Sequence, residues 1–155
     1  MPVAPPVTSL FLIAHTPLAS ALRAAAMHAF PEAAGAMLAY DVPAGADIEA
    51  YRHDAGLLLD SLGAGPVLII TDVFGASPCN IARLLAERPA TRAVAGVSLP
   101  MLWRVLNYRD RPLDDLVTIA IAGANQGAMQ VAANRPQNQA QKLPSHDPID
   151  RNHQQ

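Results

Sequence analysis

The sequence predicts an α/β fold, a mostly parallel and doubly wound sheet of four strands with helices on both faces. Two apolar segments, residues 9–14 and 67–70, show no polar alternation, which is typical of strands buried on both faces. A segment of helical composition follows each predicted strand. The resulting order β-α-β-α-β-α-β-α favours a parallel sheet that helices cover on both sides.

The first half of the chain contains two of the four predicted strands, at residues 9–14 and 36–42. Thr16 is the predicted N-cap of a helix over residues 18–28, with Pro17 at the first helical position. Asp47 is the predicted N-cap of a second helix, which extends to about residue 62. Glycine and proline at 63–66 then predict a turn.

The second half begins with a strand–loop–helix unit that carries much of the candidate site. After the strand at 67–70 come Asp72 and Gly75, and then Ser77 and Pro78, which we expect to be the N-cap and the first residue of a helix through 87. A strand at 91–97, a short helix at 101–108 and a last helix from 113 to about 133 complete a domain that we place at residues 8–133. We expect a frayed N-terminus at 1–7 and a disordered polar tail at 135–155.

The composition restricts the classes of function. The chain has 155 residues, enough for one domain with its own core. Its net charge of −2, without a basic cluster, argues against binding of nucleic acid or of anionic membranes. No apolar run reaches the ~20 residues of a membrane span. The single cysteine, Cys79, excludes an internal disulfide and fits a cytoplasmic chain.

The candidate site joins residues that are far apart in the sequence. His15 follows the first strand and Asp72 follows the third, and right-handed crossovers place the carboxyl ends of parallel strands on one edge of the sheet. A neutral imidazole can take and return a phosphoryl group, and a carboxylate on its other nitrogen fixes its tautomer. The amides of Gly75, Ala76 and Ser77, with the Ser77 hydroxyl, are candidate donors to the phosphate.

Taken singly, these residues have ordinary explanations that the sequence leaves open. His15 is also read as a plain loop histidine, and Asp72 as a capping or turn aspartate. Cys79 is read as a small buried residue rather than as a reactive thiol. We expect His28 and His53 to be exposed on helices without a functional role. Neither a dinucleotide-binding Gly-x-Gly-x-x-Gly pattern nor a P-loop occurs, and we expect no cofactor and no metal site.

Three blocks of the sequence carry a more specific signal. They are Leu12-Ile13-Ala14-His15-Thr16-Pro17-Leu18, Thr71-Asp72-Val73-Phe74-Gly75-Ala76-Ser77-Pro78-Cys79-Asn80-Ile81-Ala82 and Val94-Ala95-Gly96-Val97-Ser98-Leu99-Pro100-Met101-Leu102. In this order they resemble the mannose-family IIA domain of the bacterial phosphotransferase system, over about residues 8–132. That family has a histidine after the first strand, an Asp-x-x-Gly-Gly-Ser-Pro-x-Asn loop after the third, and a Gly-Val-Asn-x-Pro-Met segment after the fourth.

The resemblance implies a cytoplasmic phosphotransferase that carries phosphohistidine. His15 would be phosphorylated on Nε2 by the histidine phosphocarrier protein HPr and would pass the group to a separate IIB protein, for sugar uptake or as a regulatory signal. Asp72 would match the acid that orients His15, and Ser77 the serine of the phosphate loop. The resemblance also implies a homodimer and the strand order 2-1-3-4. In relatives a C-terminal antiparallel strand is exchanged between subunits, and nothing in this sequence places such a strand.

Several positions depart from the family pattern. Pro17, close behind the histidine, removes a backbone donor, and Ala76 replaces the second glycine of the loop, so that its backbone must avoid a positive φ. Two other functions stay open: the phosphotransfer subunit of a dihydroxyacetone kinase, and a non-catalytic regulatory module with a vestigial site. A flavodoxin-like ligand binder has less support, because no phosphate-binding loop follows the first strand. The sequence does not name the sugar.

Overall fold

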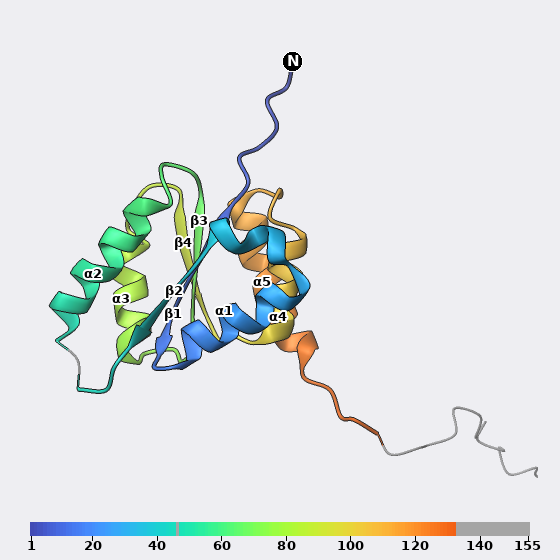
Figure 1. Ribbon diagram of the computed structural model, residues 1–155. Coiled ribbons are helices and arrows are strands. Elements are labelled where there is room, and N and C mark those ends of the chain that lie inside the picture. Colours follow the sequence, from blue (N-terminus) through green and yellow to red (C-terminus); the bar gives the residue numbers. More distant parts are fainter. Residues whose placement is uncertain (46, 133–155) are drawn as a thin grey trace, which may run out of the picture.

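The computed structural model describes residues 1–45 and 47–132 (Figure 1). In chain order the elements are β1 (Ser9–His15), α1 (Leu18–Ala29), a 3₁₀ helix η1 (Pro31–Ala36), β2 (Met37–Val42), α2 (Ile48–Ser61), β3 (Val67–Thr71), α3 (Ser77–Leu85), β4 (Thr91–Ala95), α4 (Leu99–Asn107) and α5 (Leu113–Gly127). This alternation confirms the predicted α/β class.

The four strands form one parallel sheet in the order β2-β1-β3-β4, as expected. The central strand β1 pairs on both sides, so that Ile13 lies beside Tyr40 of β2 and Thr71 of β3. Every residue of β3 is buried, which agrees with its apolar sequence. The register brings the carboxyl ends of β1 and β3 together, and this places the candidate site.

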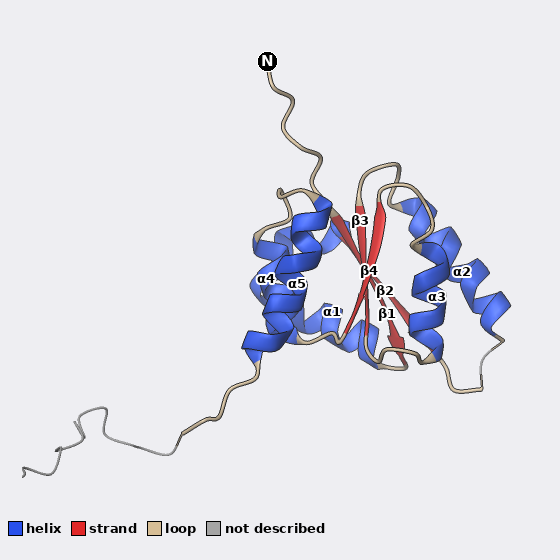
Figure 2. Ribbon diagram, turned by 180° about the vertical axis from the view of Figure 1, so that it is seen from behind, coloured by secondary structure: helices blue, strands red, loops and turns tan. Residues whose placement is uncertain are grey.

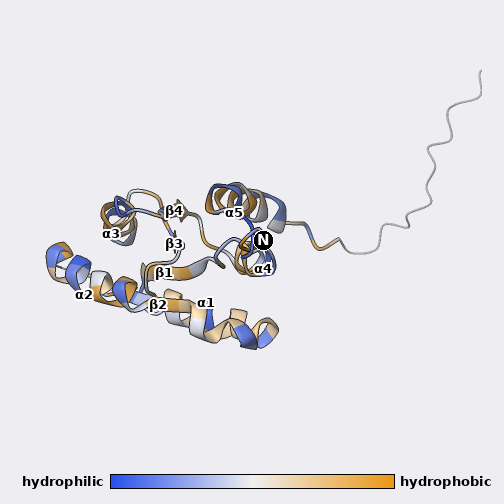
Figure 3. Cartoon of the chain, turned by 90° about the horizontal axis from the view of Figure 1, so that it is seen from above, coloured by the Kyte–Doolittle hydropathy of each residue, from blue (hydrophilic) through white to orange (hydrophobic). Residues whose placement is uncertain are grey.

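Helices cover both faces of the sheet. One layer contains α1, α4 and α5, and the other contains α2 and α3 (Figures 1 and 2). Seen along the sheet, the strands form a single column between these layers (Figure 3). Alternate residues of β1 serve the two cores, since Leu10 and Leu12 pack toward the first layer and Phe11 and Ile13 toward the second.

Helix α3 shows why the sequence forms a helix against this sheet. Its buried residues are Pro78, Ile81, Ala82 and Leu85, which recur at the spacing of one helix face. Proline stands in the first turn, where no intrahelical N–H is needed. The buried face therefore fixes α3 on the sheet with its N-terminus at the carboxyl edge.

Two predicted N-caps are wrong. Helix α1 begins at Leu18 with Pro17 at the N-cap position, and the Thr16 amide instead donates to the Val42 carbonyl at 3.1 Å. Ser77 is the first residue of α3, and the N-cap is Ala76. Both errors have the same cause, because N-capping depends on the loop backbone: α1 begins one residue later than the Thr-Pro pair suggests, and α3 begins one residue earlier than the Ser-Pro pair suggests.

The predicted N-cap of α2 is confirmed. The Asp47 carboxylate accepts hydrogen bonds from the amides of Glu49 at 3.1 Å and Ala50 at 3.4 Å. These amides belong to the first turn, where the helix itself supplies no acceptor.

Other differences concern the ends of elements. The short helix begins at Leu99 rather than 101, because Ser98 caps it and its hydroxyl accepts from the Met101 amide at 3.2 Å. Strand β4 ends at Ala95 rather than 97, since Gly96 turns the chain with φ +93°. The last helix ends at Gly127 rather than 133, where the backbone becomes extended. The 3₁₀ helix η1 was not expected.

Residues 1–7 are exposed and form neither helix nor strand. The predicted tail at 135–155, and any exchanged strand within it, lie outside the described residues. Within residues 1–45 and 47–132, no helix combines the length and the hydropathy that crossing a membrane requires.

Candidate functional site

His15 and Asp72 meet at the carboxyl edge of the sheet, as the sequence predicts. His15 is the last residue of β1 and Asp72 follows β3, its hydrogen-bonded neighbour. The ring Nδ1 of His15 lies 2.7 Å from Oδ2 of Asp72. The imidazole is 48% exposed and the carboxylate only 8%, so the acid lies behind the ring and the ring faces solvent. With Nδ1 donating to the carboxylate, Nε2 holds the lone pair of the neutral ring.

Asp72 is fixed by more than the ring of His15. The backbone amide of His15 donates to Oδ2 at 3.0 Å, and the Val73 amide donates to Oδ1 at 2.9 Å. Burial raises the pKa of the Asp72 carboxyl, but these hydrogen bonds and the adjacent imidazole outweigh it and hold the pKa below its usual value. Asp72 is therefore a carboxylate near neutral pH, with both oxygens held in place.

The loop of residues 72–77 presents the N-terminus of α3 at the same edge. Gly75 has φ +83°, a conformation that L side chains rarely adopt. Ala76 has φ −80° and ψ 171°, so it avoids a positive φ, as predicted. Its amide donates to the Val73 carbonyl at 3.3 Å, whereas the amides of Gly75 and Ser77 have no acceptor within the described part of the chain. Two of the three predicted amide donors are therefore available to an anion.

Sequence reasoning did not include Gly96 among the site residues. Its amide donates to the backbone carbonyls of Asp72 at 2.9 Å and Thr71 at 3.0 Å, so that it joins the end of β4 to the loop after β3. Its φ of +93° requires glycine. The available signal was a glycine near the end of the strand predicted at 91–97, because glycine within a strand often marks a bend.

The remaining candidates lie apart from this pair. His28 and His53 are exposed on α1 and α2, as expected. Cys79, in the first turn of α3, is half-buried rather than fully buried. It lines a cavity of about 330 Å³ with Phe74 and residues of β4.

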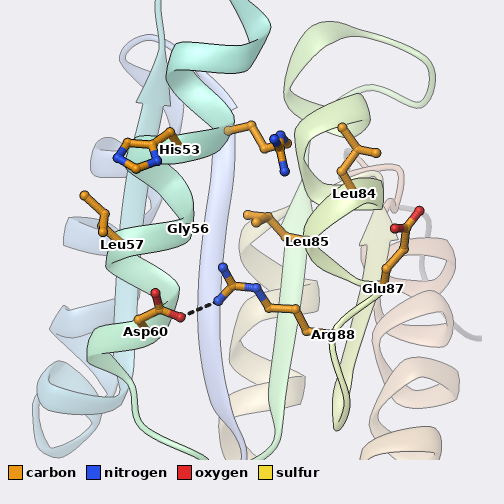
Figure 4. A pocket seen from close by; sticks show the side chains of 9 residues that line it. His53, Gly56, Leu57, Asp60, Leu84, Leu85, Glu87 and Arg88 are labelled. Atoms are coloured by element: carbon orange, nitrogen blue, oxygen red, sulfur yellow. Dashed lines mark hydrogen bonds and ion pairs between the residues drawn. The ribbon is translucent and has the colours of Figure 1, made fainter.

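A cavity of about 400 Å³ lies between α2 and α3, at the opposite end of α3 from the loop (Figure 4). Its two arginines already have partners: Arg88 pairs with Asp60, as Figure 4 shows, and Arg52 pairs with Glu49 on its own helix. The cavity therefore offers no free cationic cluster to an anion and contributes nothing to the chemistry at His15.

Apolar side chains are exposed beside the acid. Val73 is 57% exposed and Phe74 is 87% exposed, although both are large hydrophobic residues. They belong to the same loop as Asp72. The described edge thus combines a buried carboxylate, an exposed imidazole and an apolar surface next to them.

Comparison with known proteins gives the chain its family. The EIIA-man family model, described as PTS system fructose IIA component, matches residues 9–142. The mannose-specific EIIAB component of the phosphotransferase system from Escherichia coli strain K12 is 33% identical over 101 residues. This match covers 63% of the chain and 30% of the relative, so the chain spans less than a third of that protein.

Solved structures agree in fold. The mannose/sorbose-specific IIA subunit from Enterococcus faecalis superposes with a TM-score of 0.75 at 22% identity, over 83% of this chain and 98% of that one. The IIA protein associated with the fucose utilization operon of Streptococcus pneumoniae gives 0.69 at 20% identity, over 83% and 96%. At these identities the likeness concerns the fold alone.

Proposed function

The chain belongs to the mannose-family IIA components of the sugar phosphotransferase system, and on this premise we propose that it is a phosphocarrier with His15 as the phosphorylated residue. The observation that carries the proposal is the 2.7 Å contact between Nδ1 of His15 and the buried Asp72 carboxylate. It leaves Nε2 of an exposed ring as the free nucleophile.

In the proposed reaction, the lone pair of Nε2 attacks the phosphorus of a phosphohistidine on the donor protein, HPr. The new N–P bond forms as the donor's N–P bond breaks, and the donor nitrogen keeps the electron pair. The Nδ1 proton stays in its hydrogen bond to Asp72, whose negative charge stabilises the developing positive charge on the ring. The reverse sequence of steps passes the group to a IIB protein.

The loop after β3 would hold the phosphoryl oxygens. The amides of Gly75 and Ser77 and the Ser77 hydroxyl would donate to them, aided by the N-terminal end of the α3 dipole. Ala76 would contribute its backbone shape rather than its amide, since that amide already donates to Val73. Exposed Val73 and Phe74 would give a partner protein an apolar surface beside the reacting nitrogen.

The proposal also includes a cytoplasmic location and a homodimer. Cys79 is the chain's single cysteine, so that no internal disulfide demands an oxidising compartment. The dimer is an expectation from the family, and sedimentation velocity of the full chain tests it.

Incubation with phosphoenolpyruvate, enzyme I and HPr tests the transfer directly. With radiolabelled phosphoenolpyruvate, the native chain should acquire label that is labile in acid and stable in base. His15→Ala should lose the label, and His28→Ala and His53→Ala should keep it, because those side chains are exposed on helices away from Asp72. Label that survives His15→Ala would overturn the assignment.

Three further outcomes separate the competing functions. A native chain that stays unlabelled, while HPr in the same mixture is charged, would favour a non-catalytic regulatory module. Label that moves on to an added IIB protein supports transport. Label that moves instead to a nucleotide-bearing kinase subunit would identify the phosphotransfer subunit of a dihydroxyacetone kinase.

A further inference from the structure

Thr71, the last residue of β3, is a buried polar residue in an otherwise apolar strand. The residues at 67–70 are all apolar, and Thr71 itself is only 1% exposed. Burial of a hydroxyl costs free energy unless the hydroxyl has a hydrogen-bond partner. Valine has nearly the same shape and would avoid this cost, so the hydroxyl at this position needs an explanation beyond packing.

Among the described residues, the partner of this hydroxyl is the Asp72 carboxylate. Oγ1 of Thr71 donates to Oδ1 of Asp72 at 3.5 Å. The register places Thr71 beside Ile13 of β1, and His15 lies two residues further along the same strand. Because side chains alternate along a strand, the side chains of Thr71 and His15 share one face of the sheet. The hydroxyl therefore belongs to the surroundings of the reacting pair.

The hydroxyl completes a set of four donors around the Asp72 carboxylate. Oδ2 accepts from the backbone amide of His15 at 3.0 Å and from its Nδ1 at 2.7 Å. Oδ1 accepts from the Val73 amide at 2.9 Å and from the Thr71 hydroxyl. An ionised carboxylate has about four lone-pair sites, so two donors serve each oxygen. Of these four donors, Thr71 supplies the one that a substitution can remove while His15 stays in place.

The Thr71 hydroxyl is held in a defined position. The backbone carbonyl of Thr71 accepts from the amides of Gly96 and Val97, each at 3.0 Å. Its backbone also pairs with Ile13 of β1 and with Ala95 of β4. Since threonine is β-branched, its χ1 angle is restricted as well. The donor is therefore fixed to the sheet rather than to a mobile side chain.

We propose that Thr71 is a positioning residue, whose hydroxyl holds Oδ1 of Asp72 so that Oδ2 stays on Nδ1 of His15. Rotation of the carboxylate would take Oδ2 away from Nδ1, and two donors on Oδ1 oppose this rotation. The hydroxyl also favours the ionised carboxylate over the protonated one. The proton thus stays on Nδ1, and Nε2 keeps the lone pair. This inference rests on the phosphocarrier function proposed above.

NMR titration of the Asp72 side-chain carboxyl carbon in the ¹³C-labelled full chain tests the proposal without any transfer reaction. Thr71→Val keeps the shape of the side chain and removes the donor. The pKa of Asp72 should be higher in this variant than in the native chain, because the lost donor favours the ionised form. Thr71→Ser retains the hydroxyl and should keep the native pKa. An unchanged pKa of Asp72 in Thr71→Val would overturn the proposal.

Thr8→Val is the matched control. Thr8 is fully buried and precedes β1, at the opposite end of that strand from His15. Its hydroxyl has no hydrogen-bond partner within residues 1–45 and 47–132. The variant should keep the native pKa of Asp72, and its stability in urea should not fall, because a buried unpaired hydroxyl is removed. A rise in the Asp72 pKa equal to that in Thr71→Val would contradict a specific role for Thr71.

The rate of phosphoryl transfer from HPr is the second readout. Thr71→Val should accept the group about fivefold more slowly, the effect of one ordinary hydrogen bond. Thr71→Ser and Thr8→Val should react at the native rate. If Thr71 only packed β3, Thr71→Val would also react at the native rate, which would overturn the positioning role. A native chain that accepts no phosphoryl group would overturn the proposed function, and the Asp72 titration would still decide whether Thr71 holds the acid.

Discussion

The contact between His15 and Asp72 decides which ring nitrogen of the neutral imidazole carries the lone pair. Asp72 is an acceptor only, so Nδ1 must donate to it, and the neutral imidazole carries its lone pair on Nε2. The carboxylate cannot turn away easily, because the backbone amides of His15 and Val73 also hold it. The pair is therefore oriented before any partner arrives.

Replacement of this acid by Asn should make stability depend less on pH. The folded-state pKa of Asp72 lies below its ordinary value of 3.8, so the ionised form stabilises the fold above that pH and the stabilisation is lost as the pH falls through the folded pKa. Asp72→Asn should thus lower the free energy of unfolding at about pH 7 and cost much less at about pH 3. Urea unfolding at both values measures the difference.

Asp114→Asn is the control for this experiment. The Asp114 side chain is 76% exposed and pairs with Arg92 at the surface, so its removal should change stability little at either pH. A destabilisation by Asp72→Asn that is equal at both pH values would contradict the account of the Asp72 pKa.

At the residue scale the sequence predicts that His15 and Asp72 meet, but it does not predict the backbone contacts around them. His15 and Asp72 could be placed together because both follow central strands of a parallel sheet. The caps at Thr16 and Ser77 could not be judged, since capping depends on loop φ and ψ values that the residue types leave open. The hydrogen bonds from Ser20 in the first turn of α1 to the Asp41 carboxylate of β2 were beyond prediction, because they join two elements that are far apart in the sequence.

At the scale of elements, the main feature of the candidate site is the N-terminus of α3, which has no side-chain cap. The Gly75 conformation and the extended backbone of Ala76 place Ser77 at the first helical position. A helix without a side-chain cap is less stable than a capped one, by about 1 kcal/mol. An open N-terminus is also what a phosphoryl group needs.

Ala76→Asp should have opposite effects on the stability of the fold and on the rate of phosphoryl transfer. The backbone of Ala76 is extended, as an N-cap residue requires, and an aspartate there could accept from the Cys79 amide. We expect the free energy of unfolding to rise by about 1 kcal/mol and the rate of phosphoryl transfer from HPr to fall, because a carboxylate would occupy the cradle. Chemical unfolding and transfer kinetics measure the two effects.

Ala76→Gly serves as its matched control. Glycine adds no acceptor, so the N-terminus of α3 should stay open and transfer should continue. Transfer in Ala76→Asp at the native rate would contradict the assignment of this helix end to the phosphate.

Element types were more predictable than element ends. Apolar runs and helical periodicity gave the four strands and the five α-helices, since these patterns report burial. The ends follow from single local contacts, such as the Ser98 hydroxyl on the Met101 amide and the turn at Gly96. The 3₁₀ helix η1 was missed because it is a short connector with little apolar periodicity.

At the scale of the whole molecule, the parallel sheet brings residues that are far apart in the sequence to one edge. Strand order 2-1-3-4 places β1 between β2 and β3, so His15 lies beside Val42 of β2 and within hydrogen-bond distance of Asp72, which follows β3. Fold class was predictable from the order of elements, and the strand order from family resemblance. The described residues do not test the predictions for the C-terminal tail.

The core should supply stability without taking part in the chemistry. Ile70 is fully buried in β3, on the face that α1, α4 and α5 cover. Ile70→Ala should lower the free energy of unfolding by about 2–5 kcal/mol, as burial loss and a cavity combine. Leu57→Ala is the control, because Leu57 is 57% exposed and should cost far less. Equal losses in the two variants, measured by urea unfolding, would contradict the assigned core.

The central claim is that His15 carries the phosphoryl group on Nε2 while Asp72 holds Nδ1. Two-bond ¹H–¹⁵N correlation spectra of the imidazole, recorded after phosphorylation by enzyme I and HPr, test it most directly. The account predicts a phosphorylated Nε2 and a protonated Nδ1 on His15. A phosphoryl group on Nδ1 of His15, or on any other residue, would contradict it.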